Sequence, residues 1–257
     1  MSTPNLRAWA EALIPVAEEA GRSILEIQRS AFTVDAKADN SPVTAADRAA
    51  EAIVLRTLKT LTPAKPIVAE ESVAADGLPD FAGDDFWLID ALDGTKEFIQ
   101  RRPDFTVNIG FIQNGVPALG IVHAPARGDT FVGIVPERYA ARHSNGVVQR
   151  IAVRPRPARV TICGSKSHEV PELMDPFLAK YDVADRIVVG SSMKFCMVAT
   201  GDADLYPRFG PTCEWDTAAG DAVLRAAGGL VHDFTGRPLA YKKPKFLNGR
   251  FLAENKP

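Results

Sequence analysis

The stretch FWLIDALDGTKEF, from Phe86 to Phe98, joins an apolar run to a short acidic segment. The run FWLI predicts a buried strand, and two carboxylates, Asp90 and Asp93, follow at its end. A surface turn is one explanation, because Asp and Gly are common turn residues. The other is a cation site that faces a phosphate, because a helix beginning near Gly94 and Thr95 would direct free backbone N–H groups at an anion.

Acidic residues stand at comparable positions elsewhere in the chain. Glu70 follows a short apolar run, Asp216 opens a predicted helix, and Asp47 lies in the first turn of another. A single such residue usually only complements the helix dipole. Several carboxylates held together at the ends of core strands would repel one another, and oxygen-liganded divalent cations relieve that repulsion. The set predicts a magnesium site beside a phosphate, where Thr95 and Asp47 form a pair that takes a proton from water.

Familiar phosphate and metal motifs do not fit the sequence. An EF-hand loop with Gly94 as its sixth residue would need acids where Ile89 and Ala91 stand. The D-x-D spacing of haloacid dehalogenase phosphatases, the P-loop pattern and a Cys-x5-Arg loop are all missing. The three cysteines are odd in number and widely spaced, which argues against a disulfide framework and a cysteine zinc site.

Composition limits the classes of partner. Of the 257 residues, 46% are hydrophobic, enough for a sizeable core. The charge is nearly balanced, with 30 basic and 32 acidic residues, so neither nucleic acid nor an anionic membrane is favoured as a partner. The N-terminal segment lacks the apolar region of a secretory signal, and no stretch approaches the length of a membrane-spanning helix. We expect a cytoplasmic protein, with peripheral attachment at the inner membrane left open.

Hydrophobic periodicity predicts an α+β half followed by an α/β half. Helices over residues 6–27 and 44–61 precede an antiparallel-looking set of strands, and Pro15 should kink or interrupt the first helix. The expected strands cover residues 67–69, 86–90, 105–112, 118–124 and 129–135, with a tight turn at Asn114-Gly115. Pro and Arg accumulate over Arg154–Arg159, which divides the chain into domains 1–155 and 156–257. Beyond the division, strands are expected at 160–164 and 186–190, and helices at 169–181 (broken by proline), 191–201 and 217–229.

Four segments, in this order, resemble the signature motifs of the inositol monophosphatase superfamily of lithium-sensitive, magnesium-dependent phosphatases. They are SPVTAAD (41–47), AEES (69–72), DALDGT (90–95) and EWDTAAG (214–220). The resemblance covers nearly the whole chain, and is strongest to the bacterial 3'(2'),5'-bisphosphate nucleotidases of the CysQ type. It implies a layered αβαβα sandwich with the metals where the two parts meet, and leaves a homodimer open.

The resemblance also implies how two or three Mg²⁺ ions are held. Glu70, Asp90 and the backbone carbonyl of Leu92 would hold one ion. Asp90, Asp93 and Asp216 would hold a second, so that Asp90 bridges the two. A third, weaker ion would lie near Glu70 and be bound through water. Family members usually have proline where this chain has Ala91, which predicts a looser metal site and not its loss.

The remaining functional residues follow from the same resemblance. Asp47 and Thr95 would orient and deprotonate the attacking water, with Glu70 as a further catalytic residue. Gly94 and Thr95 would bind the scissile phosphate through their backbone N–H groups. Together with Asp216 on the substrate side, the positions that match nucleotide contacts are His168, Ser191, Lys194 and Arg208.

Each nucleotide contact has a structural alternative. Lys194 could be a solvated helix residue, Ser191 a helix cap and Arg208 a surface ion-pair donor. His168 could stand at a helix start without binding a ligand.

The implied reaction is removal of the 3'-phosphate of adenosine 3',5'-bisphosphate to give AMP, which clears a by-product of sulfate assimilation. Two other functions stay open. One is an inositol or sugar monophosphatase of the same superfamily, and the other is a non-catalytic regulator that binds phosphorylated metabolites.

Overall fold

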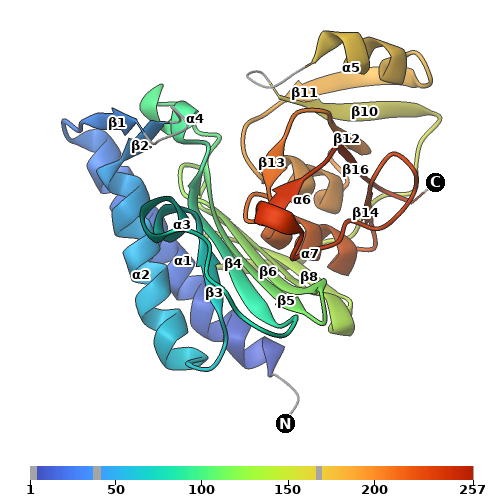
Figure 1. Ribbon diagram of the computed structural model, residues 1–257. Helices are drawn as coiled ribbons and strands as arrows, with labels where there is room; N and C mark the ends of the chain where they lie inside the picture. Colours follow the sequence, from blue (N-terminus) through green and yellow to red (C-terminus); the bar gives the residue numbers. More distant parts are fainter. Residues whose placement is uncertain (1–4, 37–41, 166–169, 257) are drawn as a thin grey trace.

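Five layers, in the order helix, sheet, helix, sheet, helix, make up the computed structural model, which describes residues 5–36, 42–165 and 170–256 (Figure 1). The first layer contains α1 (Leu6–Arg29) and α2 (Ala45–Leu61), which cover one face of a seven-stranded sheet. Its other face carries α6 (Met193–Thr200) and α7 (Ala218–Ala226). A five-stranded sheet follows, with α5 (Pro171–Leu178) on its outer face. The predicted αβαβα sandwich is confirmed.

Local sequence stabilises the start of α2, whereas core packing stabilises α1 around Pro15. Thr44 caps α2 and forms a capping box with Asp47. The interruption expected at Pro15 is wrong, because α1 continues through that residue. Pro15 is exposed, whereas Leu13 and Val16 beside it are buried. The lost backbone hydrogen bond therefore lies on the solvent side, while core packing holds the helix on the other.

The larger sheet has the order β3-β4-β5-β6-β7-β8-β9. Only β3 (Ile67–Ala69) pairs in parallel, with β4 (Phe86–Asp93); the other neighbours are antiparallel. The next three strands match the predicted ones closely: β5 (Thr106–Gln113), β6 (Val116–Ala124) and β7 (Asp129–Ile134). The sequence did not indicate the last two, β8 (Tyr139–Ser144) and β9 (Val147–Arg150). In β9 every residue is exposed, so no apolar alternation marks it.

A row of glycines brings α7 directly onto this sheet. Gly110, Gly120 and Gly133 are register partners in β5, β6 and β7. A Cβ atom at Gly120 would lie 2.2 Å from the carbonyl oxygen of Ala219, and one at Gly133 would lie 2.5 Å from the Cα of Val223. Only glycine allows such a close approach of helix and sheet backbones.

The smaller sheet has the order β11-β10-β12-β16-β14. Its strands are β10 (Arg159–Gly164), β11 (Asp182–Val188), β12 (Leu205–Arg208), β14 (Leu230–His232) and β16 (Phe251–Glu254). β10 pairs in parallel with β11 and β12, whereas β16 is antiparallel to β12 and β14. Two-residue strands β13 (Thr212–Cys213) and β15 (Leu247–Asn248) pair separately, as do β1 (Val34–Ala36) and β2 (Pro42–Thr44). Short 3-10 helices, η1 (Val135–Glu137) and η2 (Pro244–Phe246), complete this inventory.

Several predicted boundaries in the second half need correction. α5 ends at Leu178 and is not broken at Pro176, and the strand expected at 186–190 begins four residues earlier, at Asp182. α6 ends at Thr200, because Gly201 adopts a left-handed conformation with φ 81°. α7 begins at Ala218, two residues after Asp216.

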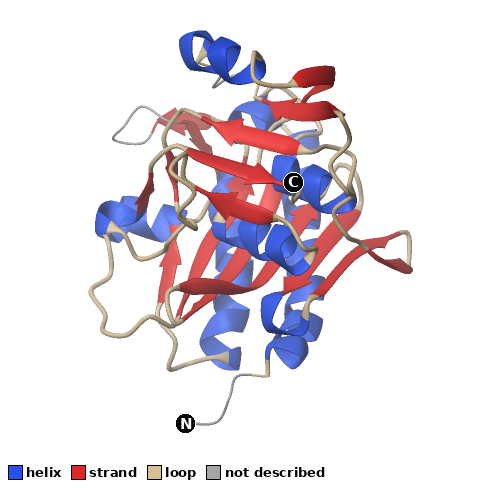
Figure 2. Ribbon diagram, turned by 90° about the vertical axis from the view of Figure 1, so that its right-hand side faces the viewer, coloured by secondary structure: helices blue, strands red, loops and turns tan. Residues whose placement is uncertain are grey.

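The division predicted at residues 155 and 156 falls between the two sheets, since β9 ends at Arg150 and β10 begins at Arg159. One apolar core nevertheless includes residues from both sheets together with α6 and α7. We therefore propose the division as a boundary between structural halves that share a core. The amino-terminal end of α1 and α5 lie at opposite ends of the molecule (Figures 1 and 2).

Candidate active site

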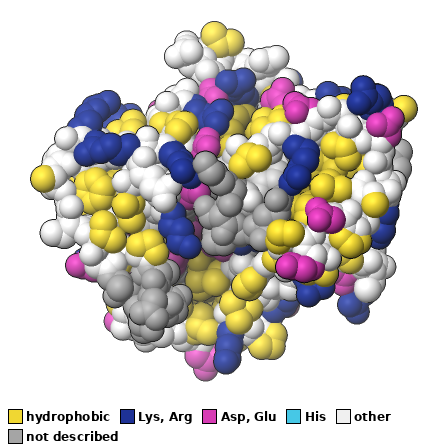
Figure 3. Space-filling view, turned by 90° about the horizontal axis from the view of Figure 1, so that it is seen from above, with side chains coloured by type: hydrophobic (Ala, Val, Ile, Leu, Met, Phe, Trp, Pro, Cys, Tyr) yellow, Lys and Arg dark blue, Asp and Glu magenta, His cyan; other side chains and the backbone are white. Residues whose placement is uncertain are grey.

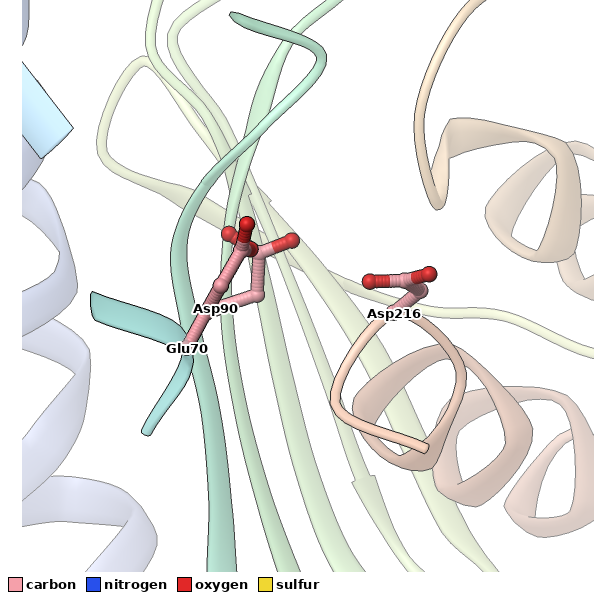
Figure 4. Close-up of side chains that lie close together, drawn as sticks. All are labelled: Glu70, Asp90 and Asp216. Carbon is pink, nitrogen blue, oxygen red and sulfur yellow. The ribbon is translucent and has the colours of Figure 1, made fainter. Parts of the chain in front are cut away.

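Three carboxylates from distant parts of the chain converge on one space. Glu70 is the first residue of α3 (Glu70–Asp76), Asp90 lies on β4, and Asp216 precedes α7 (Figure 4). One carboxylate oxygen from each lies within 4.8 Å of the other two. Among the described parts of the chain, this is the one group of His, Cys, Asp or Glu residues close enough to share a metal ion.

The aspartates at this site are destabilised as anions. Burial raises the pKa of Asp90 and of Asp216 well above the ordinary value, and the charges of neighbouring carboxylates raise it further. Burial also raises the pKa of Asp93 to about 6, although Lys194 and the Ser192 N–H oppose this. A divalent cation would reverse these shifts by supplying the missing positive charge. Because the donors are all oxygen atoms, the cluster fits Mg²⁺.

The end of β4 departs from regular strand geometry where these acids stand. Its register with β5 shifts between Asp90 and Asp93, so the strand bulges. Within the bulge the Leu92 N–H donates to Asp90 Oδ1 at 3.0 Å, which fixes the carboxylate. Ala91 and Leu92 are both buried, and Leu92 lines the same cavity as the acids. The looser metal site expected from Ala91 stays a prediction.

Asp47 and Thr95 are brought together as predicted. The Thr95 hydroxyl lies 3.0 Å from Asp47 Oδ1 and 3.3 Å from the Leu92 carbonyl oxygen. The backbone N–H and hydroxyl of Thr44 donate to the other oxygen, Asp47 Oδ2, at 2.7 and 2.8 Å. Burial raises the pKa of Asp47, while the bonds from Thr44 and Thr95 oppose the shift. The pair can therefore hold a water molecule and accept its proton.

Gly94 connects β4 to α4 (Thr95–Ile99) in a conformation that other residues rarely adopt. Its φ is 98°, and a Cβ there would lie 3.0 Å from the Asp104 carbonyl oxygen. Backbone conformation and space both therefore favour glycine at this position.

A cavity of about 280 Å³ contains most of the predicted site. Its lining includes Glu70, Asp90, Leu92, Asp93, Gly94, Thr95, Ser191, Lys194, Arg208 and Asp216. Asp47 is not on the surface of the cavity and reaches it through Thr95. His168 lies outside the described residues.

The structural alternatives for two nucleotide contacts are wrong. Lys194 is only 2% exposed, and its ammonium donates to the carbonyl oxygens of Val189 and Ser191 at 3.1 and 2.8 Å. Burial lowers the pKa of Lys194 to about 8, and Asp93 opposes the shift. Arg208 is 9% exposed and donates to the carbonyl oxygens of Gly210 and Pro211. Neither residue is a solvated surface group, although both line the cavity.

Ser191 is partly consistent with the predicted helix cap. Its hydroxyl accepts a bond from the Met193 N–H at 3.4 Å, but Ser192 stands at the cap position of α6. Ser191 has φ 51°, which is uncommon for a residue other than glycine and is found more often at functional sites.

Two groups that support the site were missed. Glu51 accepts bonds from the backbone N–H groups of Glu71 and Ser72 at 2.8 and 2.9 Å, and so fixes the start of α3, where Glu70 stands. Burial raises the pKa of Glu51, while these bonds oppose the shift. The other group is Asn108 with Ser192, beside Asp93. A polar residue inside the apolar strand FTVNIGFI was a usable signal, because a buried amide needs partners.

Seen from above, the molecule mixes charges over this face (Figure 3). Lys and Arg side chains are interspersed with acidic and apolar ones and form no continuous basic area in this view. Within the described residues, no helix is both long and apolar enough to cross a bilayer.

Comparison with known proteins agrees with this geometry. The model of the inositol monophosphatase family matches residues 5–256. The 3'(2'),5'-bisphosphate nucleotidase CysQ of Escherichia coli (strain K12) is 45% identical over 240 residues, which are 92% of this chain and 95% of that protein.

Solved structures agree over the whole length. The crystal structure of CysQ from Bacteroides thetaiotaomicron has a TM-score of 0.81 at 35% identity, covering 98% of this chain and 99% of that one. An inositol monophosphatase from Anabaena (Nostoc) sp. PCC 7120 has a TM-score of 0.78 at 27% identity, covering 98% and 92%.

Proposed function

The chain belongs to the inositol monophosphatase family, and on that premise we propose that it is a 3'(2'),5'-bisphosphate nucleotidase. The reaction is hydrolysis of the 3'-phosphate of adenosine 3',5'-bisphosphate, which leaves AMP and inorganic phosphate. For the substrate, the support is 45% identity over most of the chain to a protein of that activity. For the chemistry, the single observation that carries the proposal is the convergence of Glu70, Asp90 and Asp216 beside Thr95.

The acidic cluster would hold two or three Mg²⁺ ions. Glu70, Asp90 and the Leu92 carbonyl are the donors proposed for one ion, and Asp90, Asp93 and Asp216 for a second. When bound, Mg²⁺ lowers the pKa of a coordinated water and neutralises charge on the transferring phosphoryl group. A third ion, near Glu70, is part of the proposal.

Proton transfer is assigned to Asp47 and Thr95. Thr44 occupies one oxygen of the Asp47 carboxylate, so the other is directed to the Thr95 hydroxyl. A water held by the Thr95 hydroxyl can pass its proton to that hydroxyl while the hydroxyl proton moves to Asp47 Oδ1. The transfer leaves hydroxide to attack phosphorus in line with the departing 3'-oxygen, so no covalent phosphoenzyme is required.

The other lining residues would bind the substrate. The backbone N–H groups of Gly94 and Thr95 are assigned to the scissile phosphate. Ser191, Lys194 and Arg208 are assigned to the nucleotide and its second phosphate, and so is His168, which lies outside the described residues. The buried charges of Lys194 and Arg208 favour a substrate with more than one anionic group.

Phosphate release tests the proposal. Initial rates from adenosine 3',5'-bisphosphate and from inositol 1-phosphate are compared with Mg²⁺ and after chelation. We expect Mg²⁺-dependent release with the nucleotide strongly preferred. Faster turnover of inositol 1-phosphate would replace the proposal with the monophosphatase alternative. Tight nucleotide binding without release would indicate a binding regulator, although such a protein has no need of the Thr95–Asp47 pair.

Assembly and cellular location are proposed less specifically. A homodimer stays a prediction that sedimentation analysis can test. Location in the cytoplasm, with or without peripheral membrane attachment, also stays a prediction, and fractionation of cells would test it.

A further inference from the structure

A hydrogen-bonded ring joins Asp93 to the segment Gly190–Ser192, which also lines the cavity. The Ser192 N–H donates to Asp93 Oδ2 at 2.6 Å, and the Asn108 amide nitrogen lies 3.4 Å from the same oxygen. The Ser192 hydroxyl closes the ring by donating to Asn108 Oδ1 at 2.6 Å. Ser192 is 2% exposed and Asn108 is fully buried, so water does not compete for the bond between them, whereas the two bonds to Asp93 are partly buried.

The direction of each bond in the ring is determined. The single hydroxyl proton of Ser192 goes to Asn108 Oδ1, so the Thr106 hydroxyl, 2.9 Å away, must donate to Ser192 Oγ. The Asn108 NH2 group then faces the Asp93 carboxylate, which accepts only. A movement of Ser192 would therefore break its bonds to Asp93, Asn108 and Thr106 together.

The ring links the two halves of the molecule. Asn108 and Thr106 lie on β5, directly opposite Asp90 and Asp93 on β4. Ser192 comes from the other half, at the start of α6. The position of Ser192 in the second half therefore affects the position of the Asp93 carboxylate in the first half.

The segment before Ser192 has little freedom. A Cβ atom at Gly190 would lie 2.6 Å from the Asp104 carbonyl oxygen, so this backbone packs closely against the first half. Lys194 donates to the Ser191 carbonyl oxygen at 2.8 Å, which holds Ser191 in its left-handed conformation. A ligand that contacts Ser191 acts on a segment with few alternative positions.

We propose that Ser192 and Asn108 are positioning residues that couple nucleotide binding to metal binding. The inference rests on the proposed function, in which the nucleotide contacts Ser191 and a cation binds Asp93. Because the segment is rigid, a nucleotide that contacts Ser191 also determines the position of the Ser192 N–H, and this N–H positions the Asp93 carboxylate for the cation. By linkage, the cation raises nucleotide affinity by the same factor.

Electron paramagnetic resonance of Mn²⁺ tests the coupling without relying on turnover. Metal-free protein is titrated with Mn²⁺ in the absence and presence of saturating AMP. In the wild type, AMP should lower the Kd for Mn²⁺ by about tenfold, within the range of roughly 5–150-fold common for coupled sites. Ser192→Ala opens the ring. In this variant, AMP should lower the Kd for Mn²⁺ by less than about twofold.

A matched control separates coupling from general loss of stability. Thr62→Ala removes another buried hydroxyl, the acceptor of the Trp87 indole N–H at 2.9 Å, and should keep the wild-type factor. Thr106→Val keeps side-chain volume and removes the donor to Ser192, so it serves if Ser192→Ala does not fold. In Thr106→Val, the factor by which AMP lowers the Kd for Mn²⁺ should be at least about three times smaller than in the wild type.

The outcomes distinguish this inference from the proposed function. A wild-type protein whose Kd for Mn²⁺ does not respond to AMP overturns the inference. So does an unchanged factor in the ring variants, or an equal loss in Thr62→Ala. Release of phosphate from adenosine 3',5'-bisphosphate, measured in parallel, tests the proposed function: release without coupling overturns only the inference, and missing release overturns only the function.

Discussion

At the scale of single residues, the Thr95 hydroxyl is the group on which the proposed chemistry most depends. It touches Asp47 and the Leu92 carbonyl, and no other hydroxyl among the described residues bonds to Asp47 Oδ1. Thr95→Ala should therefore lower kcat by about 100-fold or more, the usual contribution of a positioned proton acceptor. Thr95→Ser, the matched control, should stay within about fivefold of the wild type.

Both Thr95 variants should unfold within about 3 °C of the wild type, because the side chain is only half-buried. Steady-state phosphate release and thermal unfolding measure the two effects. Equal kcat values for the Ala and Ser variants would remove Thr95 from the mechanism.

Asp90, Asp93 and Asp216 give the metal-free protein a pH dependence of stability. Their folded-state pKa is raised, to about 6 for Asp93, mainly by burial. Between an ordinary Asp value of about 3.9 and the raised value, the folded state binds more protons than the unfolded state. The contribution of these groups to the free energy of unfolding is therefore fully present below that pH window, and it falls as pH rises through the window.

Chelator-treated protein should accordingly show a lower Tm at pH 6 than at pH 4.5, and Mg²⁺ should raise Tm more at pH 7 than at pH 5. Thermal unfolding across this range measures both effects. Asp90→Asn, which removes one of the titrating carboxylates, should show a flatter slope. A metal-free protein whose Tm rises steadily from pH 4.5 to 6, with no difference in the variant, would contradict the electrostatic picture of the cluster.

At the scale of elements, the glycine row of β5, β6 and β7 determines where α7 sits, and α7 begins two residues after Asp216. Gly120→Ala would place a Cβ 2.2 Å from the Ala219 carbonyl oxygen, so the helix must move. We expect a loss of about 1–3 kcal/mol in the free energy of unfolding, the usual cost of overpacking. Weaker Mg²⁺ binding should accompany it.

Gly249→Ala is the matched control, because no atom lies within 4 Å of the added Cβ. It should change stability by less than about 0.5 kcal/mol. Urea unfolding of the two metal-free variants makes the comparison. Equal stabilities for both would show that α7 does not depend on the glycine row.

Elements with a local signal could be predicted from the sequence, whereas those defined by distant packing could not. The start of α2 after Thr44 and the strand before Asp90 depend on neighbouring residues, and both were identified correctly. The bounds of β11 were predicted incorrectly, because it is an edge strand with mostly exposed residues. The interruption predicted at Pro15 was wrong, because packing of the buried face of α1 compensates for the hydrogen bond that proline cannot form.

The same distinction holds for the residues of the candidate site. Motif resemblance located the acids, and the structure brings three of them together. The bonds of Glu51 and of the Ser192–Asn108 ring join residues 15 to 99 positions apart, and their geometry has no local pattern.

At the scale of the whole molecule, the two halves each supply part of one cavity. Glu70 and Asp90 come from the first half and Asp216 from the second, and the shared core of α6 and α7 holds the halves in place. A metal ion bound by all three would therefore also tie the halves together. We expect Mg²⁺ to stabilise the protein as a unit, with a single unfolding transition.

Calorimetric titration of metal-free protein with Mg²⁺, for the wild type and Asp90→Asn, shows whether the converging carboxylates form a metal site. Asp90 is the carboxylate shared by both proposed ions, and its amide replacement keeps the side-chain volume. We expect saturable Mg²⁺ binding with release of protons in the wild type and near-complete loss of this binding in the variant. Unchanged Mg²⁺ binding by Asp90→Asn would contradict it.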